Sequence, residues 1–320
     1  MKELKDTILY IVIPCYNEEE VLNITCSELD KKIQSLIDEN MISKDSKAVF
    51  VDDGSNDSTW SLITEMHEKN ARFEGIKLSR NQGHQNALLA GLFYSGERAD
   101  IVVSIDADLQ DDMDAINQMI EKYSMGAEIV YGVRNDRKTD TMFKRGSAQI
   151  FYRIMRIMGA EIVYNHADFR LMSSKSIKEL MNFKEVNLFL RGIVPLLGFE
   201  TAVVEYQRKE RVAGNSKYPL RKMMSFALDG ITSFTIKPID MIISAGMVCF
   251  IISIIMLVYS CIRHFMGETV SGWTSLMTSI WALGGLQVLS IGVVGKYIGK
   301  VYMEVKERPR YIIEEYTNPK

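Results

Sequence analysis

The sequence lacks any pair of cysteines at C-x-x-C spacing, and it has only four cysteines in 320 residues. They are widely separated, at Cys15, Cys26, Cys249 and Cys261, and two of them lie in an apolar C-terminal stretch. Zinc sites and disulfide frameworks both depend on closely or regularly spaced cysteines. We therefore expect four reduced, buried thiols in a protein that faces the cytosol.

Other common signals are missing too. No G-x-G-x-x-G follows the first apolar run, which argues against a dinucleotide-binding dehydrogenase, and the absence of G-x-x-x-x-G-K-[ST] excludes a P-loop. The net charge is only −3 and the pI about 5.9, so nothing predicts nucleic acid as a partner. The N-terminal apolar run reaches Pro14 without the small-residue cleavage site of a signal peptide. It is predicted to be a strand of a cytosolic domain.

Strand and helix patterns alternate along the first 134 residues. Short β-rich runs are separated by stretches with apolar residues at helical spacing. The predicted strands cover 8–14, 47–52, 73–79, 100–106 and 127–134, and the predicted helices cover 18–37, 58–70, 84–96 and 113–126. This alternation predicts an α/β fold with a mainly parallel sheet and helices on both faces.

Every predicted strand ends in an unusually polar stretch. These stretches read PCYNEE, DDGSNDS, SRNQGHQN, DADLQD and VRNDR. In open α/β sheets, ligands bind outside the carboxyl ends of the strands. The sequence therefore predicts a binding site that is assembled from several strand exits.

The fourth exit carries a dense group of carboxylates. The stretch SIDADLQD and the residues after it contain Asp106, Asp108, Asp111, Asp112 and Asp114. Neighbouring like charges repel, and unpaired carboxylates are costly to bury. This stretch is therefore a solvated turn, a helix start or half of a metal site, and for Asp106 and Asp108 to serve one metal site the strand must already be turning there. The last three acids fit the start of the next helix better, because a helix N-terminus favours negative charge.

The C-terminal third is largely apolar. Residues 241–262 carry no charge, residues 273–302 form a second apolar run, and a short polar link joins them. Roughly 20 apolar residues suffice to cross a bilayer, so the pattern predicts a transmembrane helical hairpin. Buried helices of a soluble domain are the alternative. Basic residues gather before the first run and after the second, which places both ends in the cytoplasm.

Several motifs together resemble glycosyltransferase family 2, which has the GT-A fold. They are IVIPCYNEEEVL, VDDGSNDST, LSRNQGHQNALLAGL and SIDADLQD. ADFRLMS, RGIVPLLGF and RVAGNSKYPLRKMMSFALDGITSF, followed by two apolar runs, resemble the polyprenyl-phosphate subgroup: bactoprenol glucosyltransferases and dolichol-phosphate mannose synthases. This resemblance implies a homo-oligomer, specifically a tetramer. The expected parts are a GT-A catalytic domain at 1–215, interfacial amphipathic helices at 216–238, a transmembrane hairpin at 239–303 and a cytoplasmic tail at 304–320.

The resemblance also implies roles at the donor side. Asp108 would bind Mg²⁺ or Mn²⁺ directly, Asp106 would reach the ribose or the metal's waters, and Gln110 would face the diphosphate or the sugar. The residues expected around the nucleotide are Pro14, Tyr16, Glu18, Asp53 and Arg80. Asp53 would accept a hydrogen bond from the base N3–H, which uracil has and cytosine lacks. The alternative for Tyr16 is a place in the apolar core. The alternative for Asp52, beside Asp53, is that it only closes the turn after the strand.

On the acceptor side, the resemblance points to a lipid phosphate. Arg134, Arg145 and Ser147 are the expected phosphate ligands, because arginine can hold phosphate in a bidentate fork. An active-site loop is expected to contribute Arg211, Ser216 and Lys217. Asp168 matches the position usually proposed as the catalytic base. A phosphate monoester is already largely ionised at neutral pH, so Asp168 is instead free to orient the acceptor or the sugar hydroxyls.

The sequence therefore predicts an inverting hexosyltransferase of the inner (cytoplasmic) membrane, with its catalytic domain in the cytoplasm. It would move glucose from UDP-glucose to undecaprenyl phosphate, for the modification of a cell-surface glycan. Transfer of mannose from GDP-mannose is the alternative within the family. A Mg²⁺-dependent phosphohydrolase with a D-x-D motif and a catalytically silent membrane scaffold are alternatives from other classes.

Overall fold

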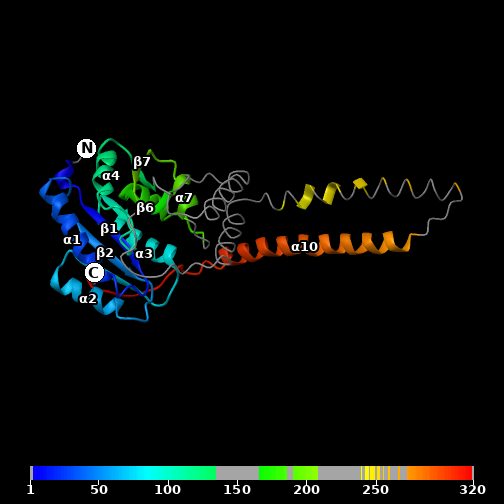
Figure 1. The fold of residues 1–320 in the computed structure, drawn as a ribbon, viewed down its shortest axis with the longest axis horizontal. Coiled ribbons are helices and arrows are strands. Elements are labelled where there is room, and N and C mark those ends of the chain that lie inside the picture. Colours follow the sequence, from blue (N-terminus) through cyan, green and yellow to red (C-terminus); the bar gives the residue numbers. More distant parts are fainter. Residues whose placement is uncertain are drawn as a thin grey trace. The chain divides into compact units, whose positions relative to one another are not determined.

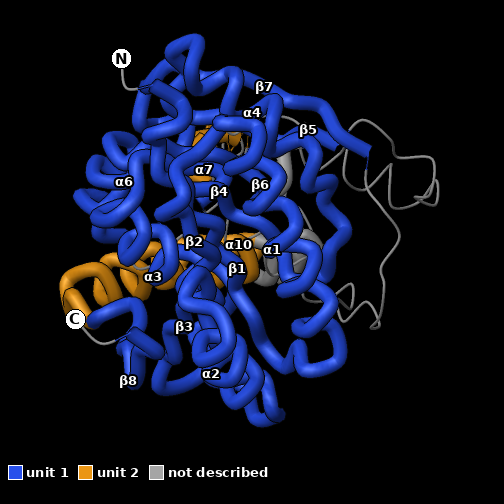
Figure 2. Tube along the Cα trace, turned by 90° about the vertical axis from the view of Figure 1, so that its left-hand side faces the viewer, with its two compact units in different colours: residues 1–156, 161–220, 309–320 blue, residues 157–160, 221–308 orange. Residues whose placement is uncertain are grey.

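The computed structural model describes residues 3–134, 166–185, 190–207 and 272–318, together with scattered residues between 239 and 266. The chain forms two compact units (Figure 2). The first unit contains residues 1–156, 161–220 and 309–320, and the second contains residues 157–160 and 221–308. The site described below lies wholly within the first unit.

An eight-stranded sheet forms the centre of the first unit (Figure 1). Its strands are β1 Leu9–Cys15, β2 Lys47–Asp52, β3 Phe73–Leu78, β4 Ile101–Ser104, β5 Ile129–Arg134, β6 His166–Ser173, β7 Thr201–Tyr206 and β8 Ile313–Tyr316. The strand order is β7-β5-β6-β4-β1-β2-β3-β8. The pairs β1–β2, β1–β4, β2–β3 and β5–β7 are parallel, which confirms the predicted α/β fold with a mainly parallel sheet.

The helices of this unit follow the strands in chain order. They are α1 Leu22–Asp38, α2 Thr59–Lys69, α3 His84–Gly96, α4 Ala115–Ser124, α6 Ser174–Leu180 and α7 Leu190–Leu196, with a short 3-10 helix η1 at Leu4–Asp6. The first four helices match the predicted ones in order and type. The first of them begins at Leu22, later than predicted, because the residues before it form a turn in which Val21 N and Leu22 N donate to Glu18 O.

The sheet is covered on both faces, as its sequence requires. All seven residues of β1 are buried, and alternate ones point to opposite faces. Leu9, Ile11 and Ile13 belong to one apolar cluster with α1, α2 and α4. On the other face, α3 packs so closely that a Cβ at Gly91 would lie 2.3 Å from the Val12 side chain. Glycine is therefore required at this point of the helix.

Strand β6 runs against both of its neighbours and brings distant residues to the site. β6 is antiparallel to both β4 and β5, and its Arg170 pairs with Ser104 at the end of β4. The N-terminal residues of β6 therefore lie beside the carboxyl end of β4. This register places Asp168 at the same edge of the sheet as Asp106.

The C-terminal residues of the chain also return to the first unit. Residues 304–320 were predicted to be a tail, but Ile313–Tyr316 form β8, which pairs antiparallel with β3. Trp60 donates a hydrogen bond from its indole Nε1 to Glu315 over 3.1 Å, and Gly75 N donates one to Thr317 over 2.8 Å. This segment therefore completes one edge of the sheet.

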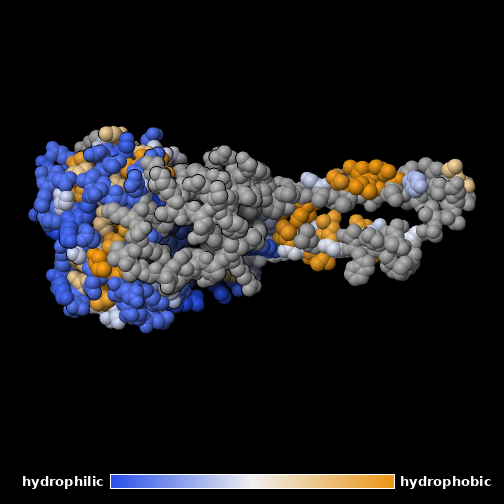
Figure 3. All heavy atoms as spheres, viewed as in Figure 1, coloured by the Kyte–Doolittle hydropathy of each residue, from blue (hydrophilic) through white to orange (hydrophobic). Residues whose placement is uncertain are grey.

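The second unit contains the long helix α10, Trp273–Val305. It covers the second apolar run, and apolar side chains such as Val288, Ile291 and Val301 are exposed on it (Figure 3). Among the described residues, no helix has both the length and the apolar content that a membrane crossing requires. Most residues of the first predicted span, 241–262, and all of the predicted interfacial segment, 216–238, lie outside the described part of the chain.

Candidate functional site

The turn after β2 connects two strand exits. Gly54 has φ of 66°, and a Cβ there would lie 2.5 Å from the backbone carbon of Arg80. Asp53 accepts hydrogen bonds from the backbone N–H groups of Gln82 (2.7 Å) and Gly83 (2.8 Å). Burial, only partly offset by these bonds, raises the pKa of Asp53. A carboxylate has room for about four hydrogen bonds, so the predicted contact between Asp53 and the base stays a prediction.

The neighbouring acid, Asp52, closes a turn, which is the alternative given for it in the sequence analysis. It is fully buried, and its Oδ1 accepts a hydrogen bond from Ser55 N over 3.1 Å. This contact is typical of an aspartate that closes a turn. Gly54 provides the backbone freedom of the same turn.

The residues predicted around the nucleotide surround this turn. Pro14 is buried at the end of β1, while Glu18 is half-buried and Tyr16 is 39% exposed. The exposed ring of Tyr16 argues against a core role and leaves its face available for a ligand. Arg80 is exposed in the loop after β3. All four lie at strand exits of the same sheet edge, as their positions in the sequence predicted.

The acidic stretch after β4 is not part of a regular strand. β4 ends at Ser104, and Leu109 has φ of 55°, a conformation that costs a non-glycine residue about 1–2 kcal/mol. Asp106 and Asp108 are half-buried, and Gln110 N donates a hydrogen bond to Asp108 Oδ1 over 3.2 Å. The chain has therefore left the strand before Asp106 and turns over residues 107–109, as the shared-site hypothesis required.

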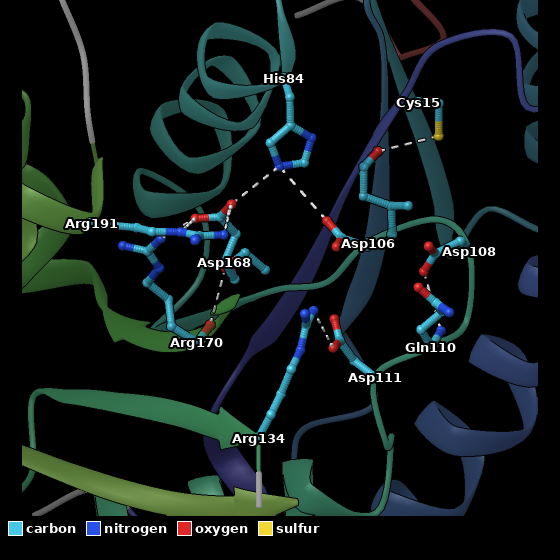
Figure 4. A network of polar contacts seen from close by, with 12 residues as sticks. Cys15, His84, Asp106, Asp108, Gln110, Asp111, Arg134, Asp168, Arg170 and Arg191 are labelled. Atoms are coloured by element: carbon cyan, nitrogen blue, oxygen red, sulfur yellow. Dashed lines mark hydrogen bonds and ion pairs between the residues drawn. The ribbon is translucent and has the colours of Figure 1, made fainter. Parts of the chain in front are cut away.

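Asp168 is surrounded by three cationic side chains (Figure 4). Arg170 Nη2 lies 2.8 Å from its Oδ1. Arg191 approaches both oxygens, with Nε 3.3 Å from Oδ1 and Nη2 3.1 Å from Oδ2. His84 Nε2 lies 3.6 Å from Asp168 Oδ2 and 3.7 Å from Asp106 Oδ1, so it bridges the two carboxylates.

The two bridged carboxylates have opposite electrostatic environments. Burial alone would raise the pKa of Asp168, but Arg191, His84 and Arg170 together hold it well below its usual range. Burial raises the pKa of Asp106 to about 6, because the nearby acids Asp111, Asp168 and Asp108 reinforce burial against His84. Burial would lower the pKa of His84, yet Asp168 and Asp106 raise it above its usual value. Asp168 therefore stays ionised, while the region around Asp106 has an excess of negative charge.

Asp111 differs from the expectation that it starts the next helix. It is buried, and its Oδ1 accepts a hydrogen bond of 2.5 Å from the Tyr206 hydroxyl and lies 3.4 Å from Arg134 Nη2. The expectation holds for Asp114, which is the residue before α4 and pairs with Lys32 across 2.7 Å. Sequence spacing cannot separate these acids, because the turn at Leu109 decides which of them points inward.

A divalent cation fits the donor set of this region. Asp106 and Asp108 offer carboxylate oxygens, which Mg²⁺ and Mn²⁺ prefer. Burial, reinforced by the neighbouring acids Asp111, Asp168 and Asp108, raises the pKa of Asp106. The buried Asp111 Oδ2 has no hydrogen-bond partner among the described residues. In the described part of the chain, no group of three or more potential ligands is already arranged around a metal position. Asp106 and Asp108 would therefore supply part of the coordination of a cation, and oxygen atoms of a bound substrate would supply the rest.

Several residues of this site were not selected from the sequence. Arg170 and Arg191 lie inside the ADFRLMS and RGIVPLLGF motifs, but nothing in the motifs says that both guanidinium groups face Asp168. Tyr206 was missed because a tyrosine at the end of a strand looks like any core residue. His84 is a lone histidine without a second ligand at metal-binding spacing, so the sequence does not indicate that it lies between two carboxylates. The other predicted acceptor and loop residues lie outside the described part of the chain: Arg145, Ser147, Arg211, Ser216 and Lys217.

Comparison with known proteins identifies the family. The family model described as glycosyl transferase family 2 matches residues 10–181. The chain is 53% identical to Uncharacterized glycosyltransferase YkoT of Bacillus subtilis, over 96% of this chain and 91% of that protein. It is 39% identical to the SfII prophage-derived bactoprenol glucosyl transferase of Shigella flexneri, over 95% of this chain and 97% of that protein.

Among solved structures, the mannosyltransferase PcManGT of Pyrobaculum calidifontis, in complex with GDP-Man and Mn²⁺, aligns with 92% of this chain and 87% of its own. The TM-score is 0.46 and the identity 15%. A family model that matches over half of the chain, and relatives that match nearly all of it, agree with the motifs read from the sequence. The chain therefore belongs to glycosyl transferase family 2, and it is a glycosyltransferase with the GT-A fold.

Proposed function

We propose that this enzyme transfers glucose from UDP-glucose to a polyprenyl phosphate, such as undecaprenyl phosphate, with inversion at the anomeric carbon. The observation that carries the proposal is the arrangement at the carboxyl end of β4 and the start of β6. There, an acid-rich loop suited to a cation and a diphosphate adjoins an ionised Asp168 and the half-buried Arg134 and Arg191. The choice of glucose and of a polyprenyl acceptor is supported by the name of the relative from Shigella flexneri, a bactoprenol glucosyl transferase.

The chemistry needs an oxygen nucleophile and a leaving group. A phosphate monoester has its second pKa near 6, so at neutral pH the acceptor oxygen is already largely anionic. That oxygen forms the new bond to the anomeric carbon as the bond to the β-phosphate oxygen breaks, and UDP leaves with the bonding electrons. No proton has to be removed, which agrees with the low pKa of Asp168. Asp168 therefore acts as a fixed hydrogen-bond acceptor that orients a sugar hydroxyl.

Asp106 and Asp108 are the residues that we propose to hold Mg²⁺ or Mn²⁺. When bound, such a cation neutralises the negative charge that develops on a departing diphosphate. On the donor side, Gln110 and Arg80 would contact the diphosphate or the nucleotide, and Tyr16 would contact the base. On the acceptor side, Arg134 would bind the lipid phosphate together with the predicted ligands Arg145 and Ser147.

Membrane attachment belongs to the same proposal. A polyprenyl chain stays in a lipid bilayer, so the enzyme must work at its surface. The exposed apolar residues of α10, among them Ile280, Leu283 and Ile298, support contact of this helix with lipid. The basic residues beyond both apolar runs support a cytoplasmic location of the catalytic domain and of both chain ends. The predicted tetramer remains part of this proposal.

The test is a transfer assay with the full-length enzyme in membranes or lipid nanodiscs. Labelled UDP-glucose, UDP-galactose, UDP-N-acetylglucosamine and GDP-mannose are supplied separately, with undecaprenyl phosphate as acceptor. We expect label in the lipid phase with UDP-glucose, and release of one UDP per transferred sugar. Undecaprenol without phosphate is the matched control and should accept nothing.

Three outcomes would contradict the proposal. Transfer only from GDP-mannose would indicate a mannose synthase. Sugar or phosphate released without lipid phosphate would indicate a hydrolase. Donor binding without turnover under any condition would indicate a silent scaffold.

A further inference from the structure

Three polar side chains from separate segments meet beside the acidic loop. Asp111 follows β4, Arg134 ends β5 and Tyr206 ends β7. Arg134 Nε donates a hydrogen bond to the Tyr206 hydroxyl over 3.1 Å, and that hydroxyl donates to Asp111 Oδ1 over 2.5 Å. Arg134 Nη2 closes the triangle at 3.4 Å from the same oxygen. Figure 4 shows Arg134 reaching from β5 toward Asp111.

Two members of this triangle are buried and the third is not. The side chain of Asp111 is 1% exposed and Tyr206 is 4% exposed, whereas the Arg134 side chain is 27% exposed. The Tyr206 ring also packs edge-on against Phe169, with 5.1 Å between ring centroids. Asp111 and Tyr206 therefore form a buried pair that supports the partly exposed Arg134 side chain.

The contacts use only part of the guanidinium. Arginine has five N–H donors in a planar fork. Nε is bonded to Tyr206, and one N–H of Nη2 faces Asp111. Within the described part of the chain, the Nη1 edge has no hydrogen-bond partner, so it can present two N–H groups to a ligand. A phosphate matches that edge in charge and in geometry.

The contacts with Asp111 and Tyr206 also keep Arg134 from pairing with Asp106. Arg134 lies close enough to Asp106 for the two charges to interact. A guanidinium without fixed contacts would turn toward that carboxylate, because Asp106 belongs to the most acid-rich part of the site. The Tyr206 hydroxyl holds Nε in place through a hydrogen bond that requires one orientation of the guanidinium plane. These contacts thereby hold the guanidinium at Asp111 and Tyr206 instead of in an ion pair with Asp106.

We propose that Asp111 and Tyr206 are positioning residues for the acceptor: they hold Arg134 in the orientation that receives the phosphate of the lipid. This inference rests on the proposed function, because it takes the ligand of Arg134 to be the acceptor phosphate. It assigns a role to Tyr206, which lies in none of the motifs, and a new role to Asp111, which was expected to start the next helix. Tyr206 is also the last residue of β7, so it anchors the strand that leads toward the predicted loop residues Arg211, Ser216 and Lys217.

The first experiment separates acceptor use from donor use. Tyr206→Phe keeps the ring against Phe169 and removes both hydrogen bonds, and Asp111→Asn removes the charge with little change of shape. For both variants, we expect the KM for undecaprenyl phosphate to rise about tenfold, the effect of losing one charge-assisted contact. The KM for the nucleotide-sugar and the affinity for UDP should change by less than about twofold. Asp114→Asn, on the same loop but exposed, is the matched control and should behave as the wild type.

The second experiment asks whether the effect passes through Arg134. Arg134→Ala is combined with Tyr206→Phe, and the acceptor KM of the double variant is compared with that of each single variant. If Tyr206 acts by positioning Arg134, the double variant equals Arg134→Ala, since no guanidinium remains to be oriented. Equal losses in donor and acceptor KM, or full additivity in the double variant, would overturn the inference. Failure of the proposed function is distinguishable, because the wild type itself would then not use the lipid phosphate.

Discussion

The two halves of the site contain the same residue type in opposite surroundings. Around Asp168, Arg170, Arg191 and His84 gather within 2.8–3.6 Å of one carboxylate. Around Asp106, the neighbours are mainly other acids, and His84 is shared with the first half at 3.7 Å. One aspartate therefore has a pKa well below its usual range, and the other has a pKa of about 6.

The difference shows that surroundings, more than residue type, set the protonation of the two carboxylates. A carboxylate that two arginines already neutralise is a poor base but a fixed hydrogen-bond acceptor. A carboxylate among other carboxylates is incomplete until a cation joins it. The cation-rich half is thus suited to orienting reactants, and the acid-rich half to holding a metal and its diphosphate. The predictions below change one half at a time.

The largest expected effect of a single substitution comes from Asp168→Asn. This substitution keeps the shape of the side chain and removes the negative charge that both Arg191 and Arg170 contact. Turnover should fall by at least about 100-fold, as the loss of a positioned polar group commonly causes. UDP binding, measured by calorimetry, should persist because the nucleotide contacts lie elsewhere. Breaking a buried pair costs stability as well, so the melting temperature is measured in parallel. A folded variant with wild-type turnover would remove Asp168 from the site.

Metal removal tests the acid-rich half. A chelator should abolish transfer, and added Mg²⁺ or Mn²⁺ should restore it, because the carboxylates of that half require a counter-charge. Asp108→Asn should raise the metal concentration that gives half-maximal activity, while Asp112→Asn on the same loop should not. Full transfer in excess chelator would contradict the assignment of this half.

A smaller effect is expected from Arg191→Gln. It removes one of the two arginines from Asp168, and since bonds between charged groups contribute about 1.5–3 kcal/mol, kcat/KM should fall about tenfold or more. The pKa of Asp168 should rise, so activity should be lost at a higher pH than in the wild type as the solution is acidified. Arg191→Lys keeps the charge and should retain the wild-type acid limit. An unchanged pH profile for Arg191→Gln would show that Arg170 and His84 suffice.

The smallest effect on activity is expected from a buried acid outside both halves. Glu74 lies 2.6 Å from Lys47 Nζ, and it accepts hydrogen bonds from Tyr94 (2.9 Å) and Asn318 (3.2 Å). Burial would raise the pKa of Glu74, but these three contacts lower it. Its stabilising contribution is therefore present above the usual glutamate pKa of about 4.3 and disappears as pH falls through the lower folded value.

Glu74→Gln should accordingly lower the free energy of unfolding at neutral pH by about 1–3 kcal/mol. The measurement is denaturant unfolding at pH 7 and at pH 3, and the difference between the two proteins should shrink at the lower pH. Transfer activity of the folded variant should match the wild type. A drop in kcat without loss of stability would mean that this cluster communicates with the site.

Most of the first unit was predictable because its signals are local. Apolar runs of strand length, helical spacing and turn residues such as Gly54 specify elements one at a time, and parallel strands with helical connections leave few arrangements. β6 was not placed in advance, because its antiparallel direction depends on a long connection. β8 was assigned to a tail, since four residues near a chain end have no pattern of their own.

The sequence by itself determined the fold class, the family and the fact that polar residues would gather at the carboxyl ends of the strands. Those properties follow from periodicity and from motifs whose members are close in the chain. Only the tertiary structure decided that His84, Arg170 and Arg191 converge on Asp168, and that Asp111 turns inward to Tyr206 and Arg134. These contacts join residues up to 95 positions apart. Strand register and one left-handed residue bring them together, and neither is written in local spacing.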